Sequence, residues 1–363
     1  MKIRFSTLFL LFPLLVFALL AGAVGGFALW ARQPVRMPAA KVDFIVDPGS
    51  TPRSIARALH DAGIPIWAPG FILLARVTER DKMLKSGGYE AVQGDSPWTL
   101  LERMALGERS ERQITFIEGW TFKQMRAALS NAPDLKHTLA GLSDEQVMAR
   151  LGVSAKDPEG LFFPNTYVYD AGSTDLDLLR RAYATGQDIL DEAWKQRAPD
   201  LPIATPYEAL ILASLIEKEV AKPSERPRVA GVFVNRLRKD MPLQTDPSVI
   251  YGLGSSYDGH LHKRDLQQDT PWNTYTRPGL PPTPIAMAGR ASLEAALHPE
   301  ANDYLYFVAR GDGSSEFSST LSQQNRNVAH YILGQGGKNP GPRKEAGPAK
   351  GQEPPKNLEQ SKK

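Results

Sequence analysis

Cysteine is absent from this sequence of 363 residues, which excludes thiol catalysis, disulfide bonds and cysteine metal sites. Histidine is scarce, and the six histidines show no His-Glu-x-x-His spacing of a zinc hydrolase. The sequence also lacks a Gly-x-Ser-x-Gly nucleophile elbow and a glycine loop of the kind that cradles phosphate. No lysine stands in a local pattern typical of pyridoxal-phosphate binding. We therefore predict no metal and no cofactor.

A strong charge imbalance is missing too. The net charge is +3, and much of the basic excess lies in the segment that begins at Gly334. A nucleic-acid partner is therefore not expected, because such partners are held by a dense basic surface. The same segment is rich in Gly, Pro and Lys, so it cannot bury enough apolar surface to offset the entropy of ordering. We predict a disordered tail over residues 334–363.

What the sequence does have is one long uncharged run. Residues 5–31 contain no charged side chain, and about 20 apolar residues suffice to span a bilayer. Lys2 and Arg4 precede the run, and Trp30 lies near its far end, where indoles are common at membrane interfaces. The alternative is a signal peptide cleaved at residues 21–23, but the apolar run continues past that point. We expect a transmembrane helix over residues 5–31.

The region after this run predicts a small module. Residues 32–41 are interpreted as a linker, and residues 42–107 as a strand, two helices, a second strand and a trailing helix. The order strand, helix, helix, strand resembles a LysM-like module, and such modules often bind polymers of N-acetylglucosamine in secreted proteins. A unit of this kind is also a generic packing solution, so a purely structural role stays open.

Residues 108–333 predict a helix-rich α+β domain, and the fold class expected for the chain is α+β. Strands are expected at residues 113–117, 161–169 and 304–309, and helices at residues 121–129, 175–194, 207–220, 228–237 and 322–333.

The helix expected at residues 207–220 is the most informative element. It is apolar on nearly all faces up to Ile216, which is typical of a central core helix. Glu217 and Glu219 follow two residues apart, so at about 100° per residue they point to nearly opposite sides. Glu217 is expected to pair with a neighbour or to face solvent.

Glu219 lies beside the buried face of this helix. Burial and the negative end of the helix dipole favour a protonated carboxyl group, whereas the nearby Lys218 would act the other way. A carboxyl group in this setting suits a general acid. The alternative is a buried salt bridge from Glu219 to Arg228 or Arg236.

Several co-linear motifs carry a family resemblance. They are the block 213–254, which contains both glutamates, and the segments 159–167, 273–275, 279–282, 284–285, 298–299 and 303–308. Together they resemble the endolytic murein transglycosylases of the MltG type, also called YceG-like. Several motifs in one order are far more specific than one short pattern, and the resemblance runs from the membrane segment to about Ile332.

The resemblance implies a peptidoglycan lytic transglycosylase, a carbon–oxygen lyase in which Glu219 aligns with the catalytic glutamate. Such an enzyme cleaves the β-1,4 bond between N-acetylmuramic acid and N-acetylglucosamine in nascent glycan strands, and so acts as a terminase of elongation. The carboxyl group protonates the glycosidic oxygen and then accepts the proton of the muramyl C6 hydroxyl. That hydroxyl attacks C1 of its own sugar and leaves a 1,6-anhydro end. Internal attack has a high effective molarity, so no metal or cofactor is needed.

The resemblance also implies a single-pass anchor in the cell inner membrane, with residues 1–4 in the cytoplasm and the body in the periplasm. Arg32 and Arg36 flank the far end of the apolar run, so the positive-inside bias alone does not set this orientation. The expected partners are peptidoglycan glycan strands and the inner membrane. This location would place the protein beside peptidoglycan synthases and division proteins.

Polar residues near the glutamate are candidates for holding sugar hydroxyl and N-acetyl groups. They are Gln244, Thr245, Asp246, Asn235, Tyr251, Asn273 and Tyr275. Each has a structural alternative: Asp246 and Pro247 could begin a turn, Asn235 could lie on the solvated side of a helix, and Tyr275 could pack in the core.

Two other functions stay open. Asp246 could act as a second carboxylate and make the enzyme a hydrolytic muramidase, since hydrolysis usually needs two carboxylates around the bond. A non-catalytic peptidoglycan-binding or division scaffold would use the LysM-like module and the tail, and would cleave nothing.

Overall fold

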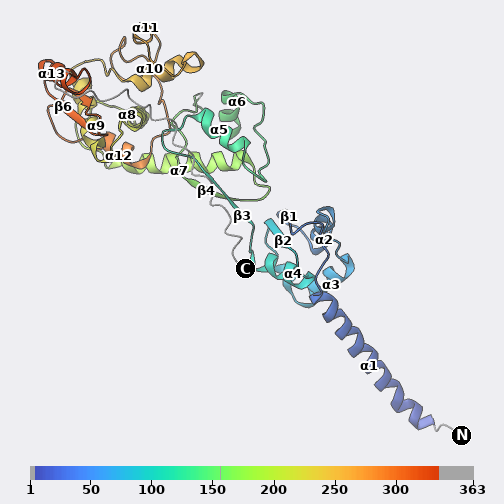
Figure 1. The fold of residues 1–363 in the computed structure, drawn as a ribbon. Coiled ribbons are helices and arrows are strands. Elements are labelled where there is room, and N and C mark those ends of the chain that lie inside the picture. The colour runs from blue at the N-terminus through green and yellow to red at the C-terminus, as the bar shows by residue number, and fades with distance from the viewer. Residues whose placement is uncertain (1–4, 156, 335–363) are drawn as a thin grey trace, which may run out of the picture. The chain divides into compact units, whose positions relative to one another are not determined.

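The computed structural model describes residues 5–155 and 157–334 of the chain (Figure 1). The residues 1–4 expected in the cytoplasm, and all but Gly334 of the tail predicted to be disordered, lie outside these ranges. The chain divides into two compact units, residues 1–188 and residues 189–363. The fold is α+β and helix-rich, as the sequence predicts, and its strands form three separate antiparallel pairs among the described residues.

The first unit begins with the helix α1 (Phe5–Arg32), which confirms the helix expected over residues 5–31. Its stretch Pro13–Arg32 is long and apolar enough to cross a membrane. Most of the side chains along this stretch are exposed, as expected of a helix that faces lipid and not a protein core.

The module that follows has the predicted order of elements. Its bounds are β1 (Lys41–Val46), α2 (Pro52–Asp61), α3 (Ala68–Val77), the short 3₁₀ helix η1 (Arg80–Lys82), β2 (Gly87–Val92) and α4 (Pro97–Leu106). The two strands pair antiparallel, from Lys41 opposite Val92 to Val46 opposite Gly87. Thr51 and Ser96 cap α2 and α4 with reciprocal hydrogen bonds, which explains where these helices begin.

The rest of the first unit contains a second strand pair and three helices. They are β3 (Glu111–Thr115), α5 (Phe122–Ser130), α6 (Asp144–Leu151), β4 (Thr166–Asp170) and α7 (Asp175–Lys195), and α7 continues across the division into the second unit. The strand predicted over residues 161–169 is wrong in its first half, because β4 begins only at Thr166. The preceding turn serves α5 instead: the buried carboxylate of Glu159 accepts a hydrogen bond from the Phe122 backbone N–H at 3.0 Å.

The second unit is built around one buried helix. Its elements are α8 (Pro206–Glu219), η2 (Pro223–Glu225), α9 (Arg226–Arg238), α10 (Asp246–Leu253), η3 (Gly254–Ser256), α11 (Lys263–Gln267), α12 (Arg290–Leu297), β5 (Tyr306–Ala309), β6 (Ser315–Ser318) and α13 (Leu321–Tyr331). Residues 211–216 of α8 are buried, and the helix contacts α9, α10 and α12 (Figure 1). The prediction of a central core helix is therefore confirmed.

The start of α8 follows directly from its sequence. The Thr205 hydroxyl accepts a hydrogen bond from the Glu208 backbone N–H at 3.2 Å, and Pro206 occupies the first turn, where its missing N–H costs nothing. The helix ends at Glu219. The core of the unit thus fixes the position of the residue expected to carry the chemistry.

Candidate active site

Glu219 is the last residue of α8 and is half-buried. Its Oε2 accepts a hydrogen bond of 3.0 Å from the Thr245 hydroxyl. Thr245 is only 2% exposed and precedes α10, so its hydroxyl is held in place by the fold. The Glu219 carboxyl group is therefore oriented by a fixed donor without being sealed from solvent.

The loop that carries Thr245 is pinned to the segment 273–275. The Gln244 backbone N–H donates to the Thr274 carbonyl at 3.1 Å, and the Thr245 backbone N–H donates to the Thr274 hydroxyl at 3.0 Å. The Ser248 hydroxyl lies 2.8 Å from the same Thr274 hydroxyl. These bonds fix the loop on both sides of Thr245.

Gln244 itself adopts a left-handed backbone conformation, with φ of 51°. A residue with a Cβ pays roughly 1–2 kcal/mol for this region, so it persists only where the surroundings hold it. Here the two bonds to Thr274 hold the loop, and they leave the Gln244 side chain exposed beside the buried Thr245. The strain is stored next to the residue that contacts Glu219.

Arg236 of α9 is a buried cation beside this loop. Its guanidinium donates to the carbonyls of Leu305 at 2.6 Å, Leu243 at 2.9 Å and Pro242 at 3.0 Å, and to Oε1 of Gln244 at 3.3 Å. Burial lowers the pKa of Arg236, and the charge of nearby Glu219 is among the effects that oppose this shift. Arg236 thus holds the loop by hydrogen bonds to the loop's backbone carbonyls, and it brings a positive charge near Glu219.

Asp246 and Tyr275 form a second pair at the same place. The Tyr275 hydroxyl donates to Oδ1 of Asp246 at 2.6 Å. Burial raises the pKa of Tyr275, and the hydrogen bond to Asp246 and the charge of Glu219 add to the shift. The phenol therefore stays protonated at physiological pH and serves as a fixed donor to Asp246. The described structure brings Gln244, Thr245, Asp246 and Tyr275 together around Glu219.

The side chains of the other three sugar-binding candidates, Asn235, Asn273 and Tyr251, contact other groups of the protein. Asn235 donates from Nδ2 to the carbonyls of Asn302 at 2.9 Å and Tyr304 at 3.0 Å. Asn273 is fully buried, and its Oδ1 accepts the Tyr275 backbone N–H at 2.8 Å. Tyr251 packs edge-on against Trp272, with ring centroids 5.5 Å apart. The two amides hold backbone segments, and Asn273 positions Tyr275.

Glu217 lies on the other side of α8. Its Oε1 pairs with Nη2 of Arg226 at 3.3 Å, and its Oε2 accepts the Gly289 backbone N–H at 3.0 Å. Only 7% of its side chain is exposed. Glu217 therefore ties α8 to the starts of α9 and α12, as expected for the glutamate that pairs with a neighbour.

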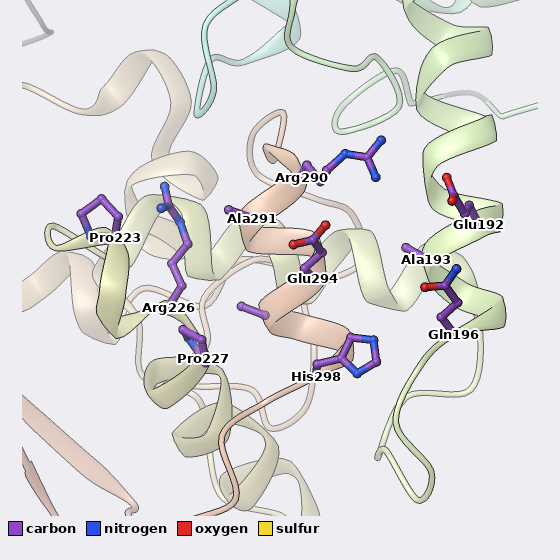
Figure 2. Close-up of a pocket in the computed structure, with 11 residues that line it drawn as sticks. Glu192, Ala193, Gln196, Pro223, Arg226, Pro227, Arg290, Ala291, Glu294 and His298 are labelled. Atoms are coloured by element: carbon purple, nitrogen blue, oxygen red, sulfur yellow. The ribbon is translucent and has the colours of Figure 1, made fainter.

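A cavity of about 500 Å³ lies on the Arg226 side of this unit. Glu294 of α12 and His298 directly after it line the cavity from one side, and Glu192 of α7 and Gln196 directly after it line the cavity from the facing side (Figure 2). Glu219 is not among its lining residues. Since Glu217 and Glu219 point to nearly opposite sides of α8, this cavity is separate from the Thr245–Glu219 contact.

Sequence reasoning missed three residues that build the site. Arg236 entered only as a salt-bridge partner, although it donates to backbone carbonyls, and Arg228 instead pairs with Glu300 at 2.9 Å. Thr274 and Ser248 were not singled out, although Thr274 lies within the motif 273–275. A threonine between two candidate residues was the available signal for Thr274, whereas no local pattern marks Ser248.

Comparison with known proteins identifies the family. The sequence matches the YceG-like family over residues 44–330. The chain belongs to the YceG-like family. The match includes most of the module, α8 and every residue placed around Glu219.

Curated and solved relatives of this family agree. An endolytic murein transglycosylase of Bacillus subtilis is 36% identical over 68% of this chain and 73% of its own length. An endolytic murein transglycosylase of Streptococcus pneumoniae is 29% identical over 78% of this chain and 57% of its own length. A crystal structure of a YceG-like protein from Listeria monocytogenes is 31% identical, with a TM-score of 0.51, over 79% of this chain and 98% of that chain.

Proposed function

We propose that this protein is a membrane-anchored endolytic lytic transglycosylase of peptidoglycan, with Glu219 as its acid and base. The observation that carries the proposal is the 3.0 Å hydrogen bond from buried Thr245 to the half-buried Glu219 carboxyl group. The names of the Bacillus and Streptococcus relatives support the same reaction class.

In the proposed reaction Glu219 gives its proton to the oxygen that joins C1 of N-acetylmuramic acid to N-acetylglucosamine. The C1–O bond breaks, and positive charge develops at C1. The C6 hydroxyl of the same muramyl residue then attacks C1 and returns its proton to Glu219. The carboxyl group ends as it began, and the new muramyl end is a 1,6-anhydro sugar. The ring closure is intramolecular, so no activated water is required.

The surrounding residues have distinct tasks in this proposal. Thr245 orients the Glu219 carboxyl group, and the nearby charge of Arg236 favours its ionised form after the proton has left. The exposed side chains of Gln244 and Asp246 are the candidates for contact with sugar hydroxyl and N-acetyl groups. Tyr275 and Asn273 support Asp246 from behind.

A glycan contact in the module is a further part of the proposal. A cavity of about 350 Å³ lies between the loop after β1 and the segment before β2, and its polar lining residues are Asp47, Ser50, Lys85, Ser86 and Arg109. Hydroxyl and charged groups around a cavity of this size suit a sugar unit. This supports the LysM-like interpretation of the module.

The test is a pair of glutamate variants in the full chain. We expect Glu219→Gln to lower cleavage of glycan strands by about 10²–10⁴-fold, because it removes the acid but keeps the shape. Glu217→Gln should keep most of the activity and lower the stability by about 1–3 kcal/mol, since the partly buried Arg226 loses its charged partner. Cleavage rates and thermal unfolding of both variants are measured together. Full activity in Glu219→Gln, or no cleavage by the unmodified chain, would overturn the proposal, and the latter result would favour a scaffold.

A further inference from the structure

The chain leaves α1 through a tight junction with the module. Ala31 is 2% exposed and belongs to the core of the module, against which Phe27 and Trp30 also pack. The Val35 backbone N–H then donates to the Asp95 carbonyl at 2.8 Å. The start of the expected linker is therefore held on the module, so that α1 and the module move together.

Two indoles meet at this junction. The rings of Trp30 and Trp67 lie edge to face, with centroids 5.2 Å apart. Gly70 makes room for them, because a Cβ at this position would lie 2.2 Å from the Trp67 ring and 2.7 Å from the Trp30 ring. Trp67 nevertheless remains 55% exposed. The two indoles together form an apolar patch, and a contiguous exposed apolar patch marks a site of contact with a protein or a membrane.

The position of α1 indicates which partner this is. The helix α1 has 28 residues, and its residues 5–31 carry no charge; at about 1.5 Å per residue this stretch is long enough to cross a hydrocarbon layer of about 30 Å. Trp30 lies at one end of that stretch, at the level of the membrane interface, and its contact with Trp67 places the second indole at the same level. Indoles are enriched at this depth.

A cavity of about 300 Å³ adjoins the two indoles. Pro65, Ile66, Trp67 and the exposed Arg36 line it together with Trp30. Apolar and aromatic walls with one cation at the rim suit a phospholipid, whose acyl chains are apolar and whose phosphate is anionic.

We propose that this junction is a second membrane contact, in which Trp67 and the adjoining cavity take up anionic phospholipid of the bilayer. The indoles and Ile66 meet the upper part of the acyl chains, and Arg36 meets the phosphate. The contact rests on the proposed crossing of the membrane by α1. It would fix the module at the bilayer surface, whereas the transmembrane helix alone only tethers it.

Single cysteine probes test this depth cleanly, because the chain has no cysteine of its own. Nitroxide labels are attached at Val24 in α1, at Ile66, and at Asp47, in the full chain in lipid nanodiscs. Asp47 follows the last residue of β1, which lies about 17 Å along the strand from its start beside the junction. Accessibility to oxygen and to a water-soluble nickel complex reports the depth of each label.

The three probes separate the anchor from the new contact. We expect the label at Val24 in lipid, the label at Asp47 in water, and the label at Ile66 several-fold less accessible to nickel than that at Asp47. A label at Val24 in water would overturn the crossing itself. A label at Val24 in lipid with labels at Ile66 and Asp47 equally exposed to nickel would overturn the junction contact and leave the anchor standing. A label at the exposed Pro65 replaces that at Ile66 if the cysteine there disturbs folding.

The charge contact has its own test with the label at Pro65. Nickel accessibility is compared in nanodiscs of phosphatidylcholine alone and in nanodiscs that also contain phosphatidylglycerol. The anionic lipid should lower accessibility further, and Arg36→Gln should remove this difference, whereas Arg53→Gln at the start of α2 should keep it. A difference that survives in Arg36→Gln would overturn the role of Arg36 in binding phosphate.

Discussion

The Glu219 carboxyl group is oriented by Thr245, a residue that lies far from it in the sequence. Thr245 lies 26 positions later in the chain, yet its hydroxyl is 3.0 Å from Oε2. A carboxyl group that must both give and accept a proton benefits from a fixed orientation, because a carboxyl oxygen that points away from the reacting oxygen lowers the rate of proton transfer. At the scale of single residues, Thr245 is therefore the most informative position after Glu219.

Thr245→Val should lower kcat/KM by roughly 10–100-fold and the free energy of unfolding by about 1–3 kcal/mol. Valine matches threonine in shape, so the buried site stays filled, but it cannot donate to Glu219; a lost bond to a charged group is worth about 1.5–3 kcal/mol. Steady-state cleavage of glycan strands measures the effect.

The matched control for this variant is Thr276→Val. The exposed Thr276 hydroxyl donates to Asp269 at 3.0 Å and to the Asn273 carbonyl at 3.3 Å, and neither bond involves the Glu219 carboxyl group, so their loss should leave kcat/KM unchanged. Equal activity of Thr245→Val and the unmodified protein would contradict the role given to Thr245.

Much of the residue-level site could be predicted from the sequence. Glu219 follows from its place at the end of an apolar helix, and Gln244, Thr245, Asp246 and Tyr275 come from motifs that the fold then brings together. Arg236 could not be assigned its role in this way. Its acceptors include three backbone carbonyls, which every residue type carries, and Leu305 lies 69 positions away. No pattern of side chains in the sequence therefore indicates these contacts.

Elements of the second unit are joined by polar side chains as well as by apolar packing. Arg236 connects α9 to the loop before α10 and to the residue that precedes β5. Glu217 connects α8 to α9 and α12 on the opposite side. Glu217 therefore holds the end of α8, and Arg236 holds the loop that carries Thr245, so both partners of the Thr245–Glu219 hydrogen bond are kept in place.

Arg236→Lys should lower both stability and kcat. An ammonium group cannot reach the four acceptors that the planar guanidinium serves, so buried carbonyls lose their donor at about 1–3 kcal/mol each. Thermal unfolding and steady-state cleavage give the two effects.

Arg238→Lys, two residues further along α9, is the control because its side chain is exposed. It should behave like the unmodified protein. A variant Arg236→Lys with unchanged Tm and unchanged kcat would show that the guanidinium does not hold the loop.

Helices with a long apolar run or a side-chain cap were predicted, whereas the short helices α10 and α12 were not. The apolar run of α8 and the capping residues of α2, α4 and α5 mark these helices in the sequence. The helix α12 has only eight residues and begins at Gly289 without a side-chain cap. At the start of α10, Asp246 and Pro247 suggested a turn, although proline is tolerated in a first helical turn.

On the scale of the whole molecule, buried tyrosines set a limit to alkaline stability. Burial raises the pKa of Tyr89, Tyr167, Tyr169 and Tyr275 above the ordinary value of about 10. The folded chain then holds these protons more tightly than the unfolded chain. Their contribution to stability is present below about pH 10 and is lost as pH rises through the folded pKa values.

We therefore expect Tm to fall steeply above about pH 10. In an absorbance titration of the folded protein, at least these four of the eleven tyrosines should ionise late. Tyr275→Phe should remove one late phenol from the curve. Eleven phenols that ionise together near their ordinary pKa in the folded protein would contradict this account.

The central claim is that one carboxyl group and an internal hydroxyl break the glycan strand. Mass spectrometry of the products made in heavy-oxygen water by the full chain tests it most directly. We predict muramyl ends of 1,6-anhydro type without heavy oxygen, because no water adds to C1. Reducing ends that carry heavy oxygen would contradict the claim, and would instead indicate a hydrolase in which a second carboxylate such as Asp246 activates water.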